Sequence, residues 1–528
     1  MWQQNWRDEI WSRLDQQWDI IIIGGGITGA GILREATRGG YKALLVEAHD
    51  FASGTSSRSS KLVHGGLRYL KNMQFKTTLE SVSERERLLN QGKGLINRLG
   101  FLFTSLEGDT TPGWVFGLGL IAYGLMAQKW QYRHYDAEDM SLLCPPLTTP
   151  KLKGGYRYFD AQTDDARLTL RVIQEAVRDG GTAISYVRAQ DLLRNQNGKV
   201  CGVVLRDESL NGSGRTAEVQ APLVISATGA WADELRTQLG LTERLRPLRG
   251  SHLVFPNARL PLMRAVSLIH PADARPVFAF PWEGVTVVGT TDVDVGHNLA
   301  VDPAISQAEA EYLLSLVQYA FPEQELAFAD VISTWSGIRP VVDTGKAAPS
   351  KESREHVIWL EDGLLTVSGG KLTTFRIMAR QVLRAARKLL PERHTFDREL
   401  PVLDPVEADV LLSESQLKAA TTLRLVGRYG IESPSLLVHA QPEDLEYIGD
   451  TPYLWAELRW AARTEGVVHL DDLLLRRIRL GLLLPNGAAA EMARIRAIAQ
   501  PELGWDDMRW ESEVLAYNKL WNQSYSLN

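Results

Sequence analysis

The sequence predicts an α/β protein whose chain opens with a dinucleotide-binding fold. Three features support this class: a run of isoleucines at residues 20–23, a glycine-rich turn directly after it, and an acidic residue, Glu47, at the end of the next predicted strand. A continuous β-branched run is typical of a parallel strand that is buried on both faces. Residues 18–50 therefore read as a βαβ unit.

The glycine turn places Gly24, Gly26 and Gly29 in the GxGxxG spacing. The first glycine permits a tight turn, the second lets a pyrophosphate approach the backbone, and the third lets the helix pack closely on the sheet. The pyrophosphate then sits at the positive end of the helix predicted over residues 28–37. Glu47 follows Gly29 by 18 residues, where a carboxylate binds ribose hydroxyls and would repel the 2′-phosphate of NADP.

Composition excludes several classes of function. The chain has 528 residues, of which 44% are hydrophobic and 23% are charged, so it is long enough for several folded domains. Its net charge of -6 gives no reason to expect nucleic-acid binding. Cys144 and Cys201 are its two cysteines and form no CxxC motif, so we expect neither a disulfide framework nor a metal centre. Catalysis should rest on an organic cofactor or on ordinary side chains.

Patterning along the rest of the chain predicts three divisions. Residues 1–17 are predicted to form an N-terminal amphipathic helix, and residues 18–390 an oxidoreductase region in which the cofactor-binding and substrate-binding segments alternate. Residues 391–528 are predicted to form a helical C-terminal domain. The strand candidates are residues 223–227, 277–280 and 285–289, and the C-terminal helix candidates are residues 456–463, 471–484 and 488–499.

Two segments raise the question of membrane contact. The tryptophans of residues 2–18 fall on one side of a helix, which fits either packing on the protein's own domain or an interfacial helix. Residues 111–128 contain no charged side chain, and their apolar part, 113–127, is short for a membrane span. A buried hairpin or helix, an interfacial membrane segment and a true span all remain open for this segment.

Seven further segments resemble one known family in order along the chain. They are AHDFASGTSSRSSKLVHGGLRYL at 48–70, TDDARL at 163–168, ATGAWAD at 227–233, GSHLVFP at 250–256, GTTDVD at 289–294, WSGIRPVV at 335–342 and SGGKLTTF at 368–375. This set is similar to the FAD-dependent, quinone-linked glycerol-3-phosphate dehydrogenases. The resemblance implies a glutathione-reductase-like FAD-binding Rossmann domain, an antiparallel-sheet substrate domain and a C-terminal helical domain.

The resemblance also implies which residues bind FAD. Residues 53–61 hold six hydroxyl side chains, which in isolation are typical of a mobile polar loop but here follow the predicted ribose-binding acid. Thr373, near the late glycine pair, could instead cap a helix. The predicted FAD-binding residues are Gly24, Gly25, Gly26, Ile27, Thr28, Gly29, Glu47, Ala48, Thr55, Ser56, Ser57, Ser59, Ser60, Lys61, His64, Ala227, Thr228, Gly229, Gly370, Lys371, Leu372 and Thr373.

Substrate and catalytic residues follow from the same resemblance. The predicted substrate-binding residues are Arg68, Tyr69, Arg339, Arg354 and Lys371, since arginine makes paired, charge-assisted bonds to phosphate oxygens. His252 is the candidate general base, oriented by Asp292, and His64 is its rival. A core position for His252 and a structural role for Arg68 or Arg339 are the alternatives.

The activity that the family implies is oxidation of sn-glycerol 3-phosphate to dihydroxyacetone phosphate, with hydride transfer to FAD and electrons passed to a membrane quinone. The protein would then be cytoplasmic and attached peripherally or monotopically to the inner face of the plasma membrane. A homodimer is left open. The alternatives are an oxidase that uses oxygen, an amine or amino-acid oxidase, and a non-catalytic flavin-binding sensor or scaffold.

Overall fold

The computed structural model describes residues 2–66, 75–107, 132–147, 151–209, 214–297, 299–343, 345, 355–392, 399–406 and 417–527. The uncharged segment 111–128, and with it the apolar stretch 113–127, lies outside these residues. Among the helices that are described, none combines the length and the apolar composition that a membrane crossing requires.

The first layer is a six-stranded, mostly parallel sheet with the order β18-β19-β11-β1-β2-β7. Its members are β1 (Ile20–Ile23), β2 (Ala43–Val46), β7 (Thr182–Ile184), β11 (Leu223–Ser226), β18 (Val357–Glu361) and β19 (Leu364–Ser368). Strand β1 is paired in parallel on both sides, and all four of its isoleucines are buried, as the β-branched run predicts. Helices α2 (Ile27–Arg38), α7 (Asp165–Arg178) and α10 (Phe375–Ala385) belong to this layer. The predicted dinucleotide-binding sheet is confirmed.

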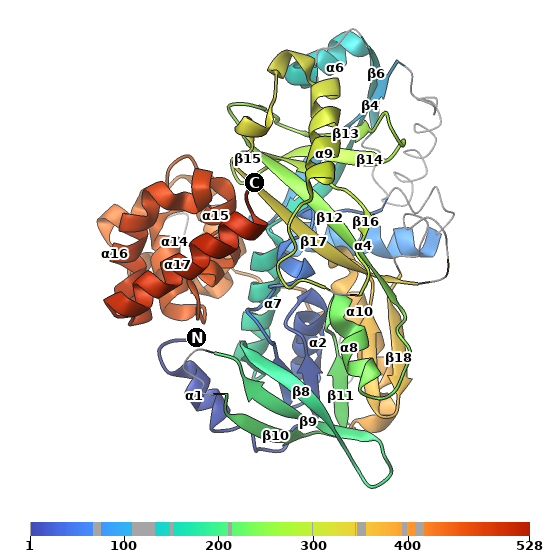
Figure 1. The fold of residues 1–528 in the computed structure, drawn as a ribbon, viewed down its shortest axis with the longest axis vertical. Coiled ribbons are helices and arrows are strands. Elements are labelled where there is room, and N and C mark those ends of the chain that lie inside the picture. Colours follow the sequence, from blue (N-terminus) through green and yellow to red (C-terminus); the bar gives the residue numbers. More distant parts are fainter. Residues whose placement is uncertain are drawn as a thin grey trace.

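The second layer is a ten-stranded, mostly antiparallel sheet at the upper end of the molecule in Figure 1. Its strands are β3 (Leu62–Val63), β4 (Ile96–Leu106), β5 (Arg133–Tyr135), β6 (Leu152–Thr163), β12 (Leu245–Pro256), β13 (Ala265–Ile269), β14 (Pro276–Trp282), β15 (Val285–Gly289), β16 (Val293–Asp294) and β17 (Ser333–Val342). One pair, β13 with β4, is parallel. The helices of this region are α4 (Phe75–Gln91), α6 (Ala137–Leu143) and α9 (Gln307–Ala320), whereas α8 (Ala232–Thr237) contacts β19 of the parallel sheet. This layer matches the predicted substrate domain.

The chain passes repeatedly between the two layers. It leaves the parallel sheet after β2, returns for β7 and β11, leaves again for the long strands β12 and β17, and returns last for β18 and β19. A separate three-stranded meander, β8 (Val187–Arg194), β9 (Val200–Asp207) and β10 (Thr216–Gln220), extends from the parallel sheet. As a result, helix α10 packs beside α2 although the two are more than 300 residues apart in the chain.

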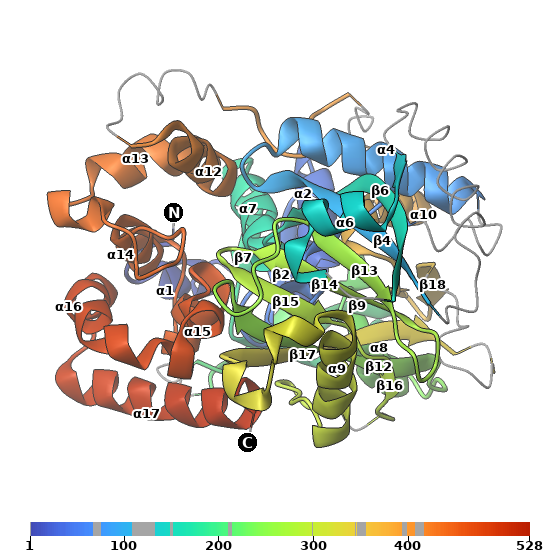
Figure 2. The same ribbon diagram turned by 90° about the horizontal axis from the view of Figure 1, so that it is seen from above.

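Helices from the C-terminal part of the chain form a body of their own beside the two sheets, drawn in orange and red in Figures 1 and 2. They are α12 (Ala419–Tyr429), α13 (Ser433–Val438), α14 (Trp455–Thr464), α15 (Leu480–Leu483), α16 (Met492–Leu503) and α17 (Asp507–Ser524). Buried tryptophans, including Trp455 and Trp510, fill the space between them and the antiparallel sheet. The predicted helical C-terminal domain is confirmed.

Two of the predicted C-terminal helices have different bounds. Residues 471–484 do not form one helix: a π-helical turn (Asp472–Arg477) is followed by Arg479 in the left-handed conformation, with φ 56°, and then by α15. Three residues from Asn486 to Ala488 also have positive φ, so α16 begins at Met492 rather than at residue 488. Helical periodicity in the sequence does not reveal such breaks, because the apolar spacing continues through them.

The N-terminal segment packs inside the protein. Helix α1 (Trp6–Trp11) is only six residues long, and Trp2 and Trp18 are 4% and 3% exposed. The Trp2 ring stacks on Phe51 at 5.1 Å, and its backbone N–H donates to the carbonyl of Thr464. The burial of Trp2, Trp6 and Trp18 favours packing on the protein's own domain over an interfacial helix, while Trp11 is partly exposed.

Candidate active site

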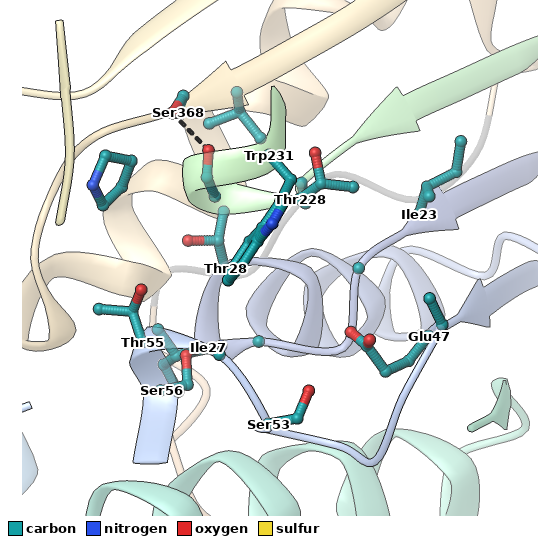
Figure 3. Close-up of a pocket in the computed structure, with 18 of the residues that line it drawn as sticks. Ile23, Ile27, Thr28, Glu47, Ser53, Thr55, Ser56, Thr228, Trp231 and Ser368 are labelled. Atoms are coloured by element: carbon teal, nitrogen blue, oxygen red, sulfur yellow. Dashed lines mark hydrogen bonds between the residues drawn. The ribbon is translucent and has the colours of Figure 1, made fainter. Parts of the chain in front are cut away.

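A cavity of about 450 Å³ opens at the carboxyl ends of β1, β11 and β19 (Figure 3). This is the edge at which ligands bind in open parallel sheets. Residues from seven separate stretches of the chain line it: Ile23, Gly24, Gly26, Ile27, Thr28, Glu47, Ala48, His49, Ser53, Gly54, Thr55, Ser56, Ser59, Arg188, Ala189, Ala227, Thr228, Gly229, Trp231, Glu234, Leu235, Leu299, Val301, Pro340, Val367, Ser368, Gly369, Gly370, Lys371 and Leu372.

The glycine turn forms the floor of this cavity at the N-terminus of α2. Gly24 has φ 112°, and a Cβ there would lie 2.6 Å from the carbonyl oxygen of Ala227. A Cβ on Gly29 would lie 1.9 Å from the carbonyl oxygen of Gly24, so only glycine lets the helix approach the strand. The N–H of Ile27 donates to Ser56 Oγ at 2.9 Å. The turn therefore brings backbone N–H groups and a helix N-terminus to the cavity, where an anionic group is favoured.

Glu47 stands at the end of β2, on the other side of the α2 N-terminus from Thr55 and Ser56 in Figure 3. Its carboxylate accepts hydrogen bonds from the backbone N–H groups of Gly25, at 2.6 Å, and His49, at 2.9 Å. These two bonds hold the carboxylate at the cavity wall, where it can accept hydrogen bonds from the hydroxyls of a bound ribose.

Strand β19 and the turn that follows it form the opposite end of the cavity. Gly369 and Gly370 follow β19 with φ near 80°, a conformation that residues with a side chain rarely adopt. Ser368 Oγ donates to the carbonyl of Gly229 at 3.1 Å and so ties this turn to the one after β11. Lys371 lines the cavity, and its ammonium donates to Ser81 Oγ at 2.9 Å.

Glycines also clear one face of the antiparallel sheet for two predicted site residues. Gly250 on β12 faces Gly337 on β17, and a Cβ on Gly250 would lie 2.3 Å from Nη2 of Arg339. A Cβ on Gly289 would lie 2.2 Å from Cδ2 of His252. The guanidinium of Arg339 and the ring of His252 therefore lie flat against neighbouring strands on the same face of the sheet.

Arg339 is held in place by side chains from the loop after β15. It donates to Asp292 Oδ1 at 2.9 Å, to Thr290 Oγ1 at 2.9 Å and to the carbonyl of Thr291 at 3.1 Å. The sequence interpretation assigned Asp292 to His252, and this pairing is wrong. The carboxylate bonds to the arginine, because the loop turns it toward β17.

His252 is 1% exposed and stacks on Trp335, with ring centroids 4.8 Å apart. Its Nε2 lies 2.9 Å from Ser60 Oγ. Burial, followed by the nearby cations Lys61 and Arg339, lowers the pKa of His252 well below its ordinary value of 6.5. The imidazole is therefore neutral at physiological pH.

Comparison with known proteins identifies the family. The model of the FAD dependent oxidoreductase family matches residues 19–382, and that of the C-terminal domain of alpha-glycerophosphate oxidase matches residues 384–510. The aerobic glycerol-3-phosphate dehydrogenase of Staphylococcus haemolyticus is 34% identical over 487 residues, covering 88% of this chain and 87% of its own. Glycerol-3-phosphate dehydrogenase 2 of Mycobacterium bovis is 33% identical over 532 residues, covering 96% and 88%.

The chain belongs to the FAD-dependent glycerol-3-phosphate dehydrogenase family. The X-ray structure of a glycerol-3-phosphate dehydrogenase from Bacillus halodurans, complexed with FAD, matches it with a TM-score of 0.78 at 28% identity over 98% of both chains.

FAD is the cofactor of this family, and the cavity described above suits FAD. The glycine turn and the α2 N-terminus would hold the pyrophosphate, since a side chain at Gly24 would collide with the backbone there. Glu47 would bind the ribose of the adenosine half. The turn after β19, with Lys371, would border the isoalloxazine half.

Most predicted FAD-binding residues line the cavity, but some do not. Gly25 and Gly29 support the glycine turn from behind, and Ser57, Ser60, His64 and Thr373 lie outside the lining, where Thr373 Oγ1 donates to the carbonyl of His64. Lys61 points away: its ammonium donates to Asp165 at 2.9 Å and to the Ser57 carbonyl. Burial lowers the pKa of Lys61 to about 8. Arg68, Tyr69 and Arg354 lie outside the described residues.

Sequence reasoning missed several residues of the cavity wall. Ser53, Trp231 and Pro340 stand inside segments that carried the family resemblance, so the signal for them was present. Arg188 and Ala189 come from the separate meander, on strand β8, and no motif marks them.

Proposed function

We propose that this protein oxidises sn-glycerol 3-phosphate to dihydroxyacetone phosphate and passes the electrons to a membrane quinone. The names of the relatives support the substrate. The observation that carries the proposal is the juxtaposition of Arg339, a phosphate-binding type of side chain, with neutral His252 on one glycine-cleared sheet face. Bound FAD supplies the hydride acceptor.

Arg339 is the proposed anchor for the substrate phosphate. Its planar fork makes paired bonds to phosphate oxygens. The bonds from Arg339 to Asp292 and Thr290 fix the plane of the guanidinium before substrate arrives, so that phosphate binding orients the C2 hydroxyl. Arg68, Tyr69, Arg354 and Lys371 complete the proposed substrate-binding set.

His252 is the proposed acceptor of the C2 hydroxyl proton. Its lowered pKa keeps the ring neutral, and Nε2 lies 2.9 Å from Ser60 Oγ. His252 is not part of the cavity lining, but its partner Ser60 directly follows Ser59, which is. His64 remains the rival base, and its half-buried position is compatible with that role.

Anaerobic titration with sn-glycerol 3-phosphate tests the substrate. The flavin absorbance of the purified holoenzyme should bleach on addition of glycerol 3-phosphate but not of glycerol, which lacks the phosphate that Arg339 would bind. Equal bleaching by both compounds would show that the enzyme does not require the phosphate of its substrate. No bleaching by either compound would contradict the proposed reaction. Bleaching by an amino acid would favour the amine-oxidase alternative.

The electron acceptor is tested separately. A quinone should reoxidise the substrate-reduced enzyme much faster than oxygen does, and the protein should float with liposomes through the apolar segment 113–127. Rapid oxygen uptake without quinone would instead favour an oxidase, the activity named in the family description that matches residues 384–510.

A further inference from the structure

Three buried arginines reach from the C-terminal helices into the FAD-binding part of the protein. Arg476, Arg477 and Arg479 stand within four residues, where the π-helical turn ends and α15 begins. All three side chains are almost completely buried. A buried guanidinium must be paired with an acceptor. The partners of the three arginines therefore show which segments of the protein these arginines hold together.

The first partner is Asp50, in the loop that follows Glu47. Arg477 makes two parallel bonds to its carboxylate, at 2.7 and 2.8 Å, and Arg476 binds the same carboxylate. The Asp50 carbonyl accepts the N–H of Ser53. His49 and Ser53, on either side of Asp50, both line the cavity. These arginines therefore fix the wall of the cavity beside the adenosine half.

The second partner is Asp165, at the start of α7. Arg479 binds its Oδ1 at 2.5 Å. The other oxygen, Oδ2, accepts the backbone N–H of Ser59 at 2.9 Å and the Ser59 hydroxyl at 2.7 Å. Ser59 lines the cavity. Arg479 also binds Asp164, at 2.9 Å, so one guanidinium spans two adjacent carboxylates. The hydroxyl-rich segment is thus held from behind by the C-terminal domain.

We propose that the C-terminal helical domain retains FAD through Arg477 and Arg479, which act as positioning residues for the loops at 48–54 and 57–61. Neither arginine lines the cavity, so each acts through an acid of the FAD-binding part. Loss of Arg477 leaves Asp50 with Arg476 alone, and loss of Arg479 leaves Asp165 with Lys61 alone. Each substitution therefore removes one of two buried cations and weakens the anchor of one loop of the cavity wall. The inference concerns cofactor retention and does not depend on the substrate proposed above.

The chain offers a matched control at Arg424. This arginine also belongs to the C-terminal helices and also crosses to the sheets, binding Glu283 at 3.2 Å and Glu457 of its own domain at 2.7 Å. Glu283 stands in the turn between β14 and β15, away from the cavity lining. Substituting Arg424 weakens a contact between the C-terminal helices and the antiparallel sheet without touching either loop.

The test measures the release of FAD from the holoenzyme, followed by the fluorescence of free flavin after dilution. Arg477→Gln and Arg479→Gln should release FAD faster by about tenfold or more, whereas Arg424→Gln should stay within about twofold of the unaltered protein. Unchanged release in both loop variants, or equally fast release in Arg424→Gln, would overturn the proposal.

Amide hydrogen exchange of the same holoenzymes distinguishes positioning from a general loss of stability. Exchange should rise at residues 48–54 in Arg477→Gln and at residues 57–61 in Arg479→Gln. A uniform rise over both loops in both variants would contradict the proposal. If Arg477→Gln does not fold, Arg477→Lys keeps the charge but loses the paired bonds, and it should show the same loop-specific exchange with a smaller amplitude.

Discussion

Arginines play two different parts in this protein, and the contrast between the sheet face and the domain interface shows what separates them. Arg339 keeps 22% of its side chain exposed and is oriented by Asp292 and Thr290. Arg477 is 1% exposed and bonds to Asp50 through both terminal nitrogens. A guanidinium with solvent-facing atoms can engage a ligand, whereas one enclosed by carboxylates holds backbone segments together. Burial and partners, rather than residue type, decide the role.

The largest effect is expected at the sheet face, from His252→Asn. Asparagine keeps a polar group but cannot accept the proton, so kcat should fall by about 10²–10⁴-fold. Stopped-flow reduction of the flavin by glycerol 3-phosphate measures the step directly. The matched variant Ser60→Ala, which removes the neighbouring hydroxyl alone, should lose much less, and an unchanged rate in His252→Asn would transfer the role of base to His64.

Arg339→Gln should lower kcat/KM by about 10²–10³-fold, because a charged partner of the phosphate is lost. Steady-state kinetics with saturating FAD measure this loss. Arg424→Gln, which removes an interface arginine remote from the cavity, should leave kcat/KM nearly unchanged. A similar loss of kcat/KM in both variants would show that the arginines of the sheet face and of the domain interface do not differ in role.

Gly250→Ala should raise KM by about tenfold, because the added methyl group would lie 2.3 Å from Nη2 of Arg339 and displace the guanidinium. The colliding atoms belong to the side chains of Arg339 and Thr290 and not to the backbone, so the fold should survive, and thermal unfolding serves as the control. An unaltered KM would show that the plane of the guanidinium is not critical for substrate binding.

The smallest expected effect is on stability at the far side of the interface. Burial opposes protonation of His469, but its bond to Glu513 and the charges of Glu513, Asp471 and Asp472 together raise the pKa of the imidazole above 6.5. The stabilisation is fully present below pH 6.5 and is lost as pH rises through the raised pKa. As pH rises from 6.5 through the raised pKa of His469, the Tm of the unaltered protein should therefore drop relative to that of His469→Gln by about 2 °C or less. An opposite trend would mean that His469 is neutral in the fold.

The parts of the fold that follow from local chemistry could be predicted. The GxGxxG turn depends on contacts within one βαβ unit, so Gly24, Gly29 and Glu47 were identified with their roles in the turn and at the strand end. The antiparallel sheet and the helical C-terminal domain were predicted through the family resemblance rather than from periodicity alone.

The parts that depend on distant segments could not be predicted. Arg479 leaves the helical conformation where its side chain reaches Asp164, more than 300 residues earlier, and nothing near residue 479 signals that partner. The sequence interpretation paired Asp292 with His252, whereas the structure pairs it with Arg339. The direction of the loop after β15 depends on how β12 pairs with β15 and β17, which the sequence does not reveal. Lys61 stands among hydroxyl residues that line the cavity, yet Asp165 holds its side chain elsewhere.

The return of the chain to the parallel sheet at β19 has a consequence for biosynthesis. The glycine turn emerges from the ribosome early, but the opposite wall at residues 368–372 is made some 340 residues later. Contacts of such long sequence separation form late in folding and slowly. Flavin incorporation must therefore await most of the polypeptide, and a chain truncated before β19 should accumulate as a colourless, aggregation-prone fragment.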